Sequence, residues 1–507
     1  MPPLRIKSVK VTIVVCFFAI IFRMFYWQII KFDAINLQAT NQLIKPSIKT
    51  GQKGNIYFQD NSLLAGNELY YQLSLYKPEI KDLESLKTKF PNLDSFINNP
   101  KQKWITLKDH FDYNFYLNNQ EKGFIWETKF TRFYPNQLAI PIINGLENYY
   151  QNFLAGKTKY TWEKKDALNR SLITNLQSKA NSGQDLKVTL NKTIQSILEK
   201  SLKTGLTKYQ ADAVSAIILN PSNGEIIAMA SFEATPSGIT ATNREHSYLF
   251  EPGSVFKPIT IAIGLESKAI DLNYQCTQCS QPYQIGDNQI SNWDNTFHPH
   301  ANLKDTIKYS DNISMSEIIK LIGKDNFLQY FDKLEINQKS GIDLPGESRP
   351  IEKKYWSPID LATASFGQGF ALTQIQLIRT FNTLANNGYL VTPHLSTQIK
   401  TNNLPIFSSK TTESLKEILK YGVEEGAVAQ FKSKNFEACG KSGTAQVALG
   451  GNYTNNQTMA SYIGFFPCNQ PKATMVVTVD NPKSSPWGSS TAAPIWFDLA
   501  SIISNLI

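Results

Sequence analysis

The sequence predicts an α+β protein with three parts: an N-terminal transmembrane helix, an elongated α+β pedestal domain, and a larger domain in which helices flank an antiparallel sheet. Twenty largely apolar residues near the N-terminus predict the first part. Strand patterns at both ends of residues 186–507, with helical patterns between them, predict the third. A chain of 507 residues is too long for one ordinary core, so two or three domains are expected.

The N-terminal segment has the pattern of a membrane anchor. Residues 1–10, the expected cytoplasmic tail, contain Arg5, Lys7 and Lys10. Residues 11–30 are long enough to span a bilayer as a helix, and the basic residues ahead of them place the N-terminus in the cytoplasm. A cleaved signal peptide is the alternative, but no small-x-small site follows the apolar run. Under either interpretation the rest of the chain is exported.

Residues 31–185 form the predicted pedestal, a spacer or dimerisation-like domain in which no catalytic pattern occurs. Residues 69–75 alternate like a strand, and residues 81–90 and 161–180 carry charged, helix-like patterns.

Residues 186–507 carry the clearest secondary-structure signals. Asn191 is placed to cap one helix, and Pro494 to open the last. Strands are expected at residues 186–190, 213–219, 225–231, 460–466 and 474–479.

Composition excludes some functions. Lys and Arg outnumber Asp and Glu by 51 to 42, a net charge of +9, but these basic residues are spread along the chain. A nucleic-acid binder would gather them into a patch, so we expect a solvated basic surface and no nucleic-acid partner.

Among the five cysteines, Cys276 and Cys279 form a Cys-x-x-Cys pair, for which a structural disulfide or free thiols are favoured over a zinc half-site or redox pair. Cys439 and Cys468 stand alone in the pattern.

The strongest chemical signal is the S-x-x-K pattern of Ser254 and Lys257. Two side chains at this spacing lie one turn apart on one face of a helix, where the amine can take the serine proton. Pro252 and Gly253 force a turn ahead of the serine, and Pro258 belongs in a first helical turn. Ser254 is therefore expected at a helix N-terminus as a nucleophile, with Lys257 as its general base.

Two further boxes follow in order. The first is Ser310-Asp311-Asn312, which comes between two helical patterns. The second begins a strand and consists of Lys441, Ser442, Gly443 and Thr444. Single matches are weak evidence, because Ser74 and Lys77 also fit S-x-x-K. The common order and the local context distinguish the three boxes from such chance matches.

The order S-x-x-K, S-D-N, K-S-G is the signature of acyl-serine enzymes that bind penicillin, and the chain resembles the class B penicillin-binding proteins, the membrane-anchored peptidoglycan D,D-transpeptidases. The family's R-G-x-I-x-D-R motif is present only loosely, at residues 53–60. Further segments similar to the family are residues 132–135, 145–147, 220–229, 243–244, 251–254, 341–347, 367–369 and 462–467.

The resemblance implies a set of catalytic roles. Ser254 would attack the carbonyl of a D-Ala-D-Ala peptide bond, and Lys257, neutral through burial and the nearby Lys441, would take its proton. Ser310 would relay this proton to the leaving amine. Asn312 would hold the lysine or a substrate carbonyl.

The third box and the serine turn would bind the substrate. Lys441 and the hydroxyls of Ser442 and Thr444 would hold the terminal carboxylate, and Gly443 would let the substrate backbone approach closely. The backbone N–H groups of Ser254 and Thr444 would form the oxyanion hole. No metal or cofactor is expected.

The resemblance also implies partners and a location. The expected partners are stem peptides on lipid-linked or nascent glycan strands, β-lactams, a membrane glycosyltransferase, and proteins of the divisome or elongasome. The expected location is the bacterial inner membrane, with the catalytic domain outside the cytoplasm. A septal role is preferred, with elongation as the alternative. A D,D-carboxypeptidase, a serine β-lactamase and a non-catalytic sensor or scaffold remain as lower alternatives.

Overall fold

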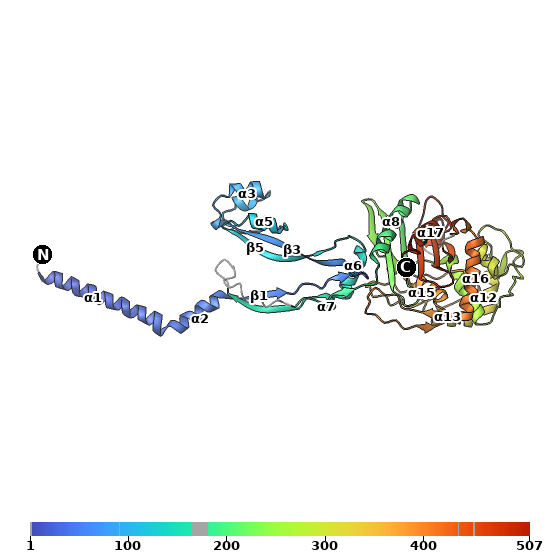
Figure 1. Ribbon diagram of the computed structural model, residues 1–507, viewed down its shortest axis with the longest axis horizontal. Coiled ribbons are helices and arrows are strands. Elements are labelled where there is room, and N and C mark those ends of the chain that lie inside the picture. The colour runs from blue at the N-terminus through green and yellow to red at the C-terminus, as the bar shows by residue number, and fades with distance from the viewer. Residues whose placement is uncertain (1–2, 91, 165–180, 434–435, 450–451) are drawn as a thin grey trace. The chain divides into compact units, whose positions relative to one another are not determined.

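The computed structural model describes residues 3–90, 92–164, 181–433, 436–449 and 452–507 (Figure 1). Two compact units emerge from the contacts within the chain. Unit 1 comprises Met1–Gly54, Asn67–Phe133 and Phe153–Gln184, and unit 2 comprises Asn55–Gly66, Tyr134–Asn152 and Asp185–Ile507. Unit 2 therefore includes two segments that precede residue 185 in the sequence.

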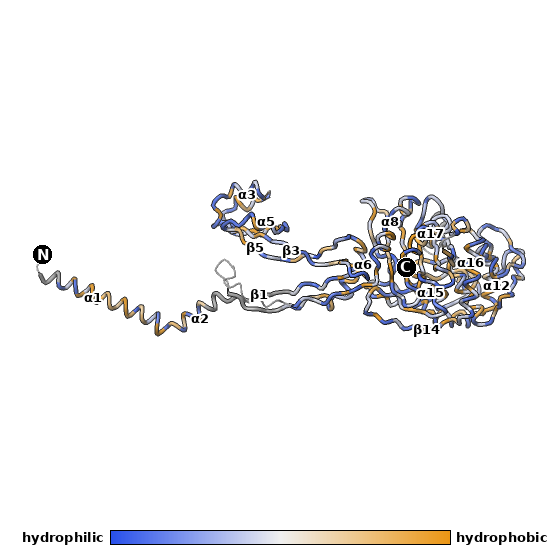
Figure 2. Tube along the Cα trace, in the orientation of Figure 1, coloured by the Kyte–Doolittle hydropathy of each residue, from blue (hydrophilic) through white to orange (hydrophobic). Residues whose placement is uncertain are grey.

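Unit 1 begins with an apolar helix. α1 (Pro3–Phe25) continues into one π-helical turn (Tyr26–Ile30), and Lys7–Ile30 is long and apolar enough to cross a membrane (Figure 2). The guanidinium of Arg23 lies over the ring of Trp27, 5.1 Å from its centroid, which gives this charge a partner close to the end of the apolar run. These features fit a membrane-anchored protein.

The remainder of unit 1 is built from short strands and helices. Buried side chains of β3, α3, α4 and β5 form a small core that includes Leu73, Leu75, Leu86, Phe96 and Phe124. The bounds of the elements after α1 are α2 (Phe32–Leu43), β1 (Ile44–Thr50), β3 (Leu63–Tyr76), α3 (Glu84–Lys89), α4 (Asp94–Asn98), β4 (Trp104–Thr106), α5 (Tyr113–Asn118), β5 (Phe124–Phe133), α7 (Gln151–Leu154) and β6 (Thr158–Lys164). The predicted strand 69–75 lies within β3.

One predicted helix of the pedestal is wrong where the structure describes it. Residues 161–164 belong to β6, which pairs antiparallel with β1 along its whole length. The β-branched and aromatic residues in this segment suit a strand, and pairing with β1 overrides the helical charge pattern. Residues 165–180 of the same prediction lie outside the described residues.

Unit 2 is organised around an antiparallel sheet, as predicted, and this sheet has six strands. Its strand order is β10-β9-β8-β17-β16-β15, so β15 forms one edge. The bounds are β8 (Ala213–Leu219), β9 (Ile226–Thr235), β10 (Gly238–Thr242), β15 (Cys439–Leu449), β16 (Asn452–Phe466) and β17 (Ala473–Asp480).

Two helices cover one face of this sheet. α8 (Lys192–Lys208) and α17 (Ala492–Ile503) bury their apolar sides against alternate residues of the strands, because successive strand residues point to opposite faces. The Asn191 side chain caps α8 as predicted, accepting a hydrogen bond from the Ile194 N–H at 3.1 Å. β7 (Leu186–Lys187) is shorter than predicted, because its partner strand Ile56–Tyr57 is itself two residues long, and this parallel pair lies outside the six-stranded sheet.

Other helices pack against the opposite face of the sheet. α15 (Gln374–Ala385) packs against β8, β16 and β17, and α16 (Ser409–Glu425) packs against β15. The remaining elements of unit 2 are β2 (Ile56–Tyr57), α6 (Ile140–Tyr149), α9 (Arg244–Ser247), α10 (Lys257–Glu266), β11 (Tyr283–Ile285), β12 (Asn288–Ile290), α11 (Leu303–Lys308), α12 (Asn312–Ile322), α13 (Lys324–Lys333), α14 (Pro358–Ser365), β13 (Tyr389–Leu390) and β14 (Leu404–Pro405).

Two disulfides lie in unit 2. Cys276 pairs with Cys279, one of the states favoured from the sequence. Cys439 and Cys468, which stand alone in the sequence pattern, also form a disulfide. Antiparallel pairing places Cys439 opposite Phe465 of β16, so that the chain just beyond β16 returns beside the start of β15.

The α8 packing gives a stability prediction. Leu198 is fully buried, and truncation to alanine leaves a cavity, so Leu198→Ala should lower the free energy of unfolding of this unit by about 3 kcal/mol. The exposed Ser196 on the same helix offers a matched control, because Ser196→Ala should change it by less than about 0.5 kcal/mol. Denaturant unfolding of the detergent-solubilised chain measures both, and equal losses would contradict the packing described.

Candidate active site

Ser254 lies where a sharp turn enters a helix. It belongs to a single 3-10 turn (Gly253–Phe256) that continues directly into α10, with Pro258 in the first turn of that helix. Gly253 has a φ of 62°, a conformation that favours glycine, and its N–H donates to the Gly367 carbonyl at 2.8 Å. A Cβ at Gly367 would lie 2.1 Å from the Gly253 carbonyl oxygen. The two glycines thus allow one loop to support the serine turn.

Lys257 is fully buried, and its amine reaches the second box. Nζ donates to the backbone carbonyl of Ser310, to Ser310 Oγ at 3.1 Å and to Asn312 Oδ1 at 2.8 Å. Burial, together with the positive charge of Lys441, holds the pKa of Lys257 well below its usual range, although the Asp311 carboxylate opposes this shift. Burial and the nearby Lys441 are the two causes that the sequence analysis expected to lower the pKa of Lys257, and both are present.

Ser310 and Asn312 are placed by the junction of two helices. Ser310 follows α11 with a φ of 56°, a left-handed conformation that costs a serine free energy. Asp311 then caps α12 by accepting from the Ser314 N–H at 2.7 Å. Asn312 Nδ2 donates to the Ser291 carbonyl at 3.2 Å, which orients its Oδ1 toward Lys257.

The third box lies on the edge strand β15. Lys441 is 6% exposed, its Nζ donates to the Ser442 carbonyl at 2.9 Å, and burial lowers its pKa to about 7. A Cβ at Gly443 would lie 2.8 Å from Val255 Cγ1 and 3.1 Å from Val255 N. The close neighbour at Gly443 is therefore the serine turn of the chain itself, so this glycine brings β15 against Ser254.

Thr444 contacts a second loop. Its Oγ1 accepts from the Gly488 N–H at 3.0 Å, so the hydroxyl hydrogen remains available to donate. A Cβ at Gly488 would lie 2.2 Å from the Gly443 carbonyl oxygen. Glycine at this position lets the loop close onto β15.

These residues border one cleft of about 770 Å³. The three boxes contribute Ser254, Ser310, Asn312, Lys441, Ser442, Gly443 and Thr444 to its lining, and Lys257 lies buried beside them. All eight residues singled out from the sequence therefore meet at one place. Within the described residues, no group of three or more His, Cys, Asp or Glu side chains is placed to hold a metal ion.

Sequence reasoning missed several residues of this region. Trp293 and Trp487 both line the cleft, with ring centroids 4.8 Å apart. His298 donates from Nδ1 to the buried Asp311 at 2.8 Å. Neither feature has a spacing signal, because the partners come from separate loops and meet only in the fold.

Comparisons with known proteins agree with this geometry. The family model for the penicillin binding protein transpeptidase domain matches residues 214–501. The chain is 28% identical over 379 residues to stage V sporulation protein D of Bacillus subtilis, covering 69% of this chain and 58% of that protein. It is 25% identical over 531 residues to "Probable peptidoglycan D,D-transpeptidase PenA" of Neisseria meningitidis, covering 97% and 90%, respectively.

A solved structure shows the same fold. Penicillin Binding Protein 2X from Streptococcus thermophilus superposes with a TM-score of 0.76 at 20% identity, over 91% of this chain and 81% of that one. The chain belongs to the penicillin-binding protein transpeptidase family. With its transpeptidase domain behind an N-terminal apolar helix, it is a class B penicillin-binding protein.

The charge of Lys441 gives a pH prediction. The sequence-based prediction that Lys257 is the general base for Ser254 requires the neutral amine, so the acylation rate should rise with pH through the pKa of Lys257. Lys441→Gln removes a positive charge that disfavours the protonated amine, so this pKa should rise and the rising limb should move to higher pH. The acylation rate at saturating penicillin, measured against pH, separates this effect from weaker binding.

The matched control is Lys308→Gln. Lys308 also lines the cleft, but it is not among the causes that lower the pKa of Lys257. Its replacement should therefore leave the rising limb of the pH–rate profile at the same pH. The proposed effect of the Lys441 charge on the pKa of Lys257 would be contradicted if the rising limb of the pH–rate profile moved to lower pH in Lys441→Gln. It would also be contradicted if the limb moved equally in both variants.

Proposed function

We propose that this protein is a peptidoglycan D,D-transpeptidase that joins stem peptides through an acyl-enzyme on Ser254. The observation that carries the proposal is the buried amine of Lys257, one turn from Ser254 and hydrogen-bonded to Ser310 and Asn312. A lysine with a strongly lowered pKa can act as a general base near neutral pH. Membership in the penicillin-binding family supports the same chemistry.

In the first half-reaction, Ser254 Oγ attacks the carbonyl of the D-Ala-D-Ala bond while Lys257 takes the hydroxyl proton. The resulting ammonium has three hydrogens, and three oxygens face it: the Ser310 carbonyl, Ser310 Oγ and Asn312 Oδ1. When Ser310 Oγ accepts from the ammonium, its own hydrogen is free to be donated. Ser310 can therefore protonate the leaving amine as the C–N bond breaks, and the terminal D-Ala departs.

The serine turn and β15 provide the binding groups. The backbone N–H groups of Ser254 and Thr444 serve as the oxyanion hole, where each donor contributes about 3 kcal/mol to the transition state. Lys441 with the Ser442 and Thr444 hydroxyls binds the substrate's terminal carboxylate. The close approach at Gly443 and Gly253 brings the two segments together, and the binding of an anion favours the charged form of Lys441.

In the second half-reaction, an amine from a neighbouring stem peptide attacks the acyl-enzyme, forms the new amide and releases Ser254. A D,D-carboxypeptidase would use water instead. The cleft extends from the three boxes to the C-terminal end of α16, where Gly422, Glu425 and Gly426 line it. This extension offers room for the acceptor peptide beside the donor.

The setting of the activity is also a proposal. The apolar segment Lys7–Ile30 anchors the protein in the inner membrane with its catalytic unit outside the cytoplasm. Nascent glycan strands reach it from a membrane glycosyltransferase partner within the division machinery. The septal role is supported by the lysine-serine-glycine-threonine box and by Asn312, and β-lactams are expected to acylate the same serine.

Penicillin labelling tests the nucleophile. A fluorescent penicillin should label the purified chain, and Ser254→Ala should abolish the label because it removes the proposed nucleophile. Ser74→Ala is the matched control, since Ser74 also fits S-x-x-K but lies in β3 and is hydrogen-bonded to Thr106 Oγ1 at 2.9 Å. Labelling should persist in this control. Label retained by Ser254→Ala would overturn the assignment, and rapid release of the label would instead indicate a β-lactamase.

Depletion of the protein in its native cell tests the septal role. Because septal cross-linking is needed to divide but not to elongate, depleted cells should become filaments. A restored copy with Ser74→Ala should return normal division, whereas Ser254→Ala should not. Round cells after depletion would assign the protein to elongation.

A further inference from the structure

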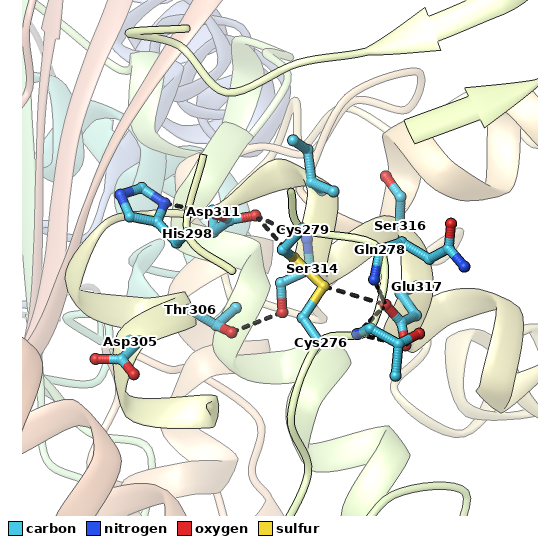
Figure 3. The surroundings of a disulfide bond; sticks show 12 residues. Cys276, Gln278, Cys279, His298, Asp305, Thr306, Asp311, Ser314, Ser316 and Glu317 are labelled. Carbon is cyan, nitrogen blue, oxygen red and sulfur yellow. Dashed lines mark hydrogen bonds and ion pairs between the residues drawn. A yellow bond between two sulfur atoms is a disulfide. The ribbon is translucent and has the colours of Figure 1, made fainter. Parts of the chain in front are cut away.

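A buried carboxylate lies directly beside the proposed proton relay. Asp311 is fully buried. Its Oδ1 accepts from the Ser314 N–H at 2.7 Å, and its Oδ2 accepts from Asn292 Nδ2 and from His298 Nδ1, both at 2.8 Å. Figure 3 shows His298 and Ser314 on different sides of this carboxylate. A buried charge needs such donors, and the proposed chemistry uses none of them.

We propose that His298 and Asn292 are positioning residues, which act through Asp311 to hold Ser310 and Asn312 in reactive geometry. The proposal rests on the proposed transpeptidase function, because it concerns the placement of the same proton relay. Neither residue touches the reacting atoms in this account. Their effect is on where the Ser310 hydroxyl and the Asn312 amide lie relative to the Lys257 amine.

The backbone conformation of Ser310 must be stabilised by contacts with neighbouring residues. Ser310 joins the end of α11 to the cap of α12 in a left-handed conformation, with a φ of 56°. A serine leaves this conformation readily unless its neighbours prevent it. Both the Ser310 carbonyl and its hydroxyl contact Lys257 Nζ, so a change in this backbone would move both contacts.

His298 holds the residues on both sides of Ser310. Its ring stacks on Tyr309, with centroids 4.1 Å apart and an interplanar angle of 7°. Its Nδ1 donates to Asp311, and because a carboxylate can only accept, Nδ1 must carry the hydrogen. One side chain thus links the residue before Ser310 to the residue after it.

Asn292 holds the other member of the box. Its Oδ1 accepts from the Asn312 N–H at 2.7 Å, while its Nδ2 donates to Asp311 and to the Thr296 carbonyl at 2.9 Å. The preceding residue, Ser291, accepts from the Asn312 side chain. Residues 291–298 therefore fix both the backbone and the amide of Asn312, and the same segment places Trp293 at the cleft.

The other side of Asp311 is closed by the first disulfide. Cys279 Sγ lies 3.9 Å from Asp311 Oδ1, and the turn between the two cysteines is held by Glu317 of α12, which accepts from the N–H groups of Thr277 and Gln278 (Figure 3). Asp311 has little freedom to shift on this side. If the hydrogen bond from His298 is lost, Asp311 would therefore shift in the direction that displaces Ser310.

The position of the hydrogen-bond donor provides the test. In His298→Asn, the side-chain Nδ2 takes roughly the place of Nδ1, so the bond to Asp311 can form. In His298→Gln, the amide nitrogen lies near the position of Nε2, and this bond is lost. Both replacements are polar amides without a ring, so they are matched for the loss of stacking on Tyr309. His300→Asn is the control, because His300 is an exposed residue of the same loop with a φ of 59° that asparagine tolerates.

The measurement is the acylation of the full detergent-solubilised chain by a fluorescent penicillin, with the rate at saturation and the half-saturating concentration determined separately. His298→Gln should slow the rate at saturation by about tenfold to a hundredfold, with little change in half-saturating concentration. His298→Asn should recover most of the rate, and His300→Asn should match the wild type.

Equal rates for His298→Gln and the wild type would overturn the positioning role. Equal losses in His298→Gln and His298→Asn would also overturn it, because the effect would then not depend on the Asp311 hydrogen bond. A wild-type chain that is not labelled at Ser254 would be a failure of the proposed function, which these variants do not test. The two failures are therefore distinguishable.

Discussion

Burial of the Lys257 amine is the constraint on which the rest of the site depends. A lysine with no exposed surface must lose its proton or find compensating partners. Here the amine meets three oxygens from the second box, and the positive charge of Lys441 further disfavours protonation. The same environment that is unfavourable for a charged lysine supports the proposed role of Lys257 as the base for Ser254. The Asp311 carboxylate limits the shift, so that the amine can still hold the proton it receives.

The fold meets this constraint by bringing three distant segments to the edge of one sheet. The 3-10 turn and α10 that follows it supply the serine and the lysine, the α11–α12 junction supplies Ser310 and Asn312, and β15 supplies Lys441 to Thr444. Glycines permit the contacts between them, since side chains at Gly367 and Gly443 would collide with neighbouring segments and Gly253 has a positive φ. The six-stranded sheet, with α8 and α17 on its far face, provides the rigid support that these close contacts require.

The residues of the three boxes were predictable from the sequence because their spacing follows local structure. S-x-x-K is a helical spacing, the proline at 258 marks a helix start, and the cap at Asn191 is a local signal. The Asp311–His298 contact and the Cys439–Cys468 disulfide were not predictable, because they join residues from separate segments. The strand at 161–164 was missed for the same reason, since its pairing partner β1 lies more than a hundred residues earlier. Local patterns thus indicated what the site contains, whereas the tertiary fold determines what holds it in place.

The central claim is that Ser254 carries a peptidyl group and passes it to an amine. Mass spectrometry after rapid quenching, with a peptide thioester donor that mimics the D-Ala-D-Ala terminus, tests it most directly. The account predicts an added acyl mass on the tryptic peptide 245–268, localised to Ser254, that disappears faster as an acceptor amine is added while the amide product accumulates. An adduct on another residue, or a decay that is independent of the amine, would contradict the account.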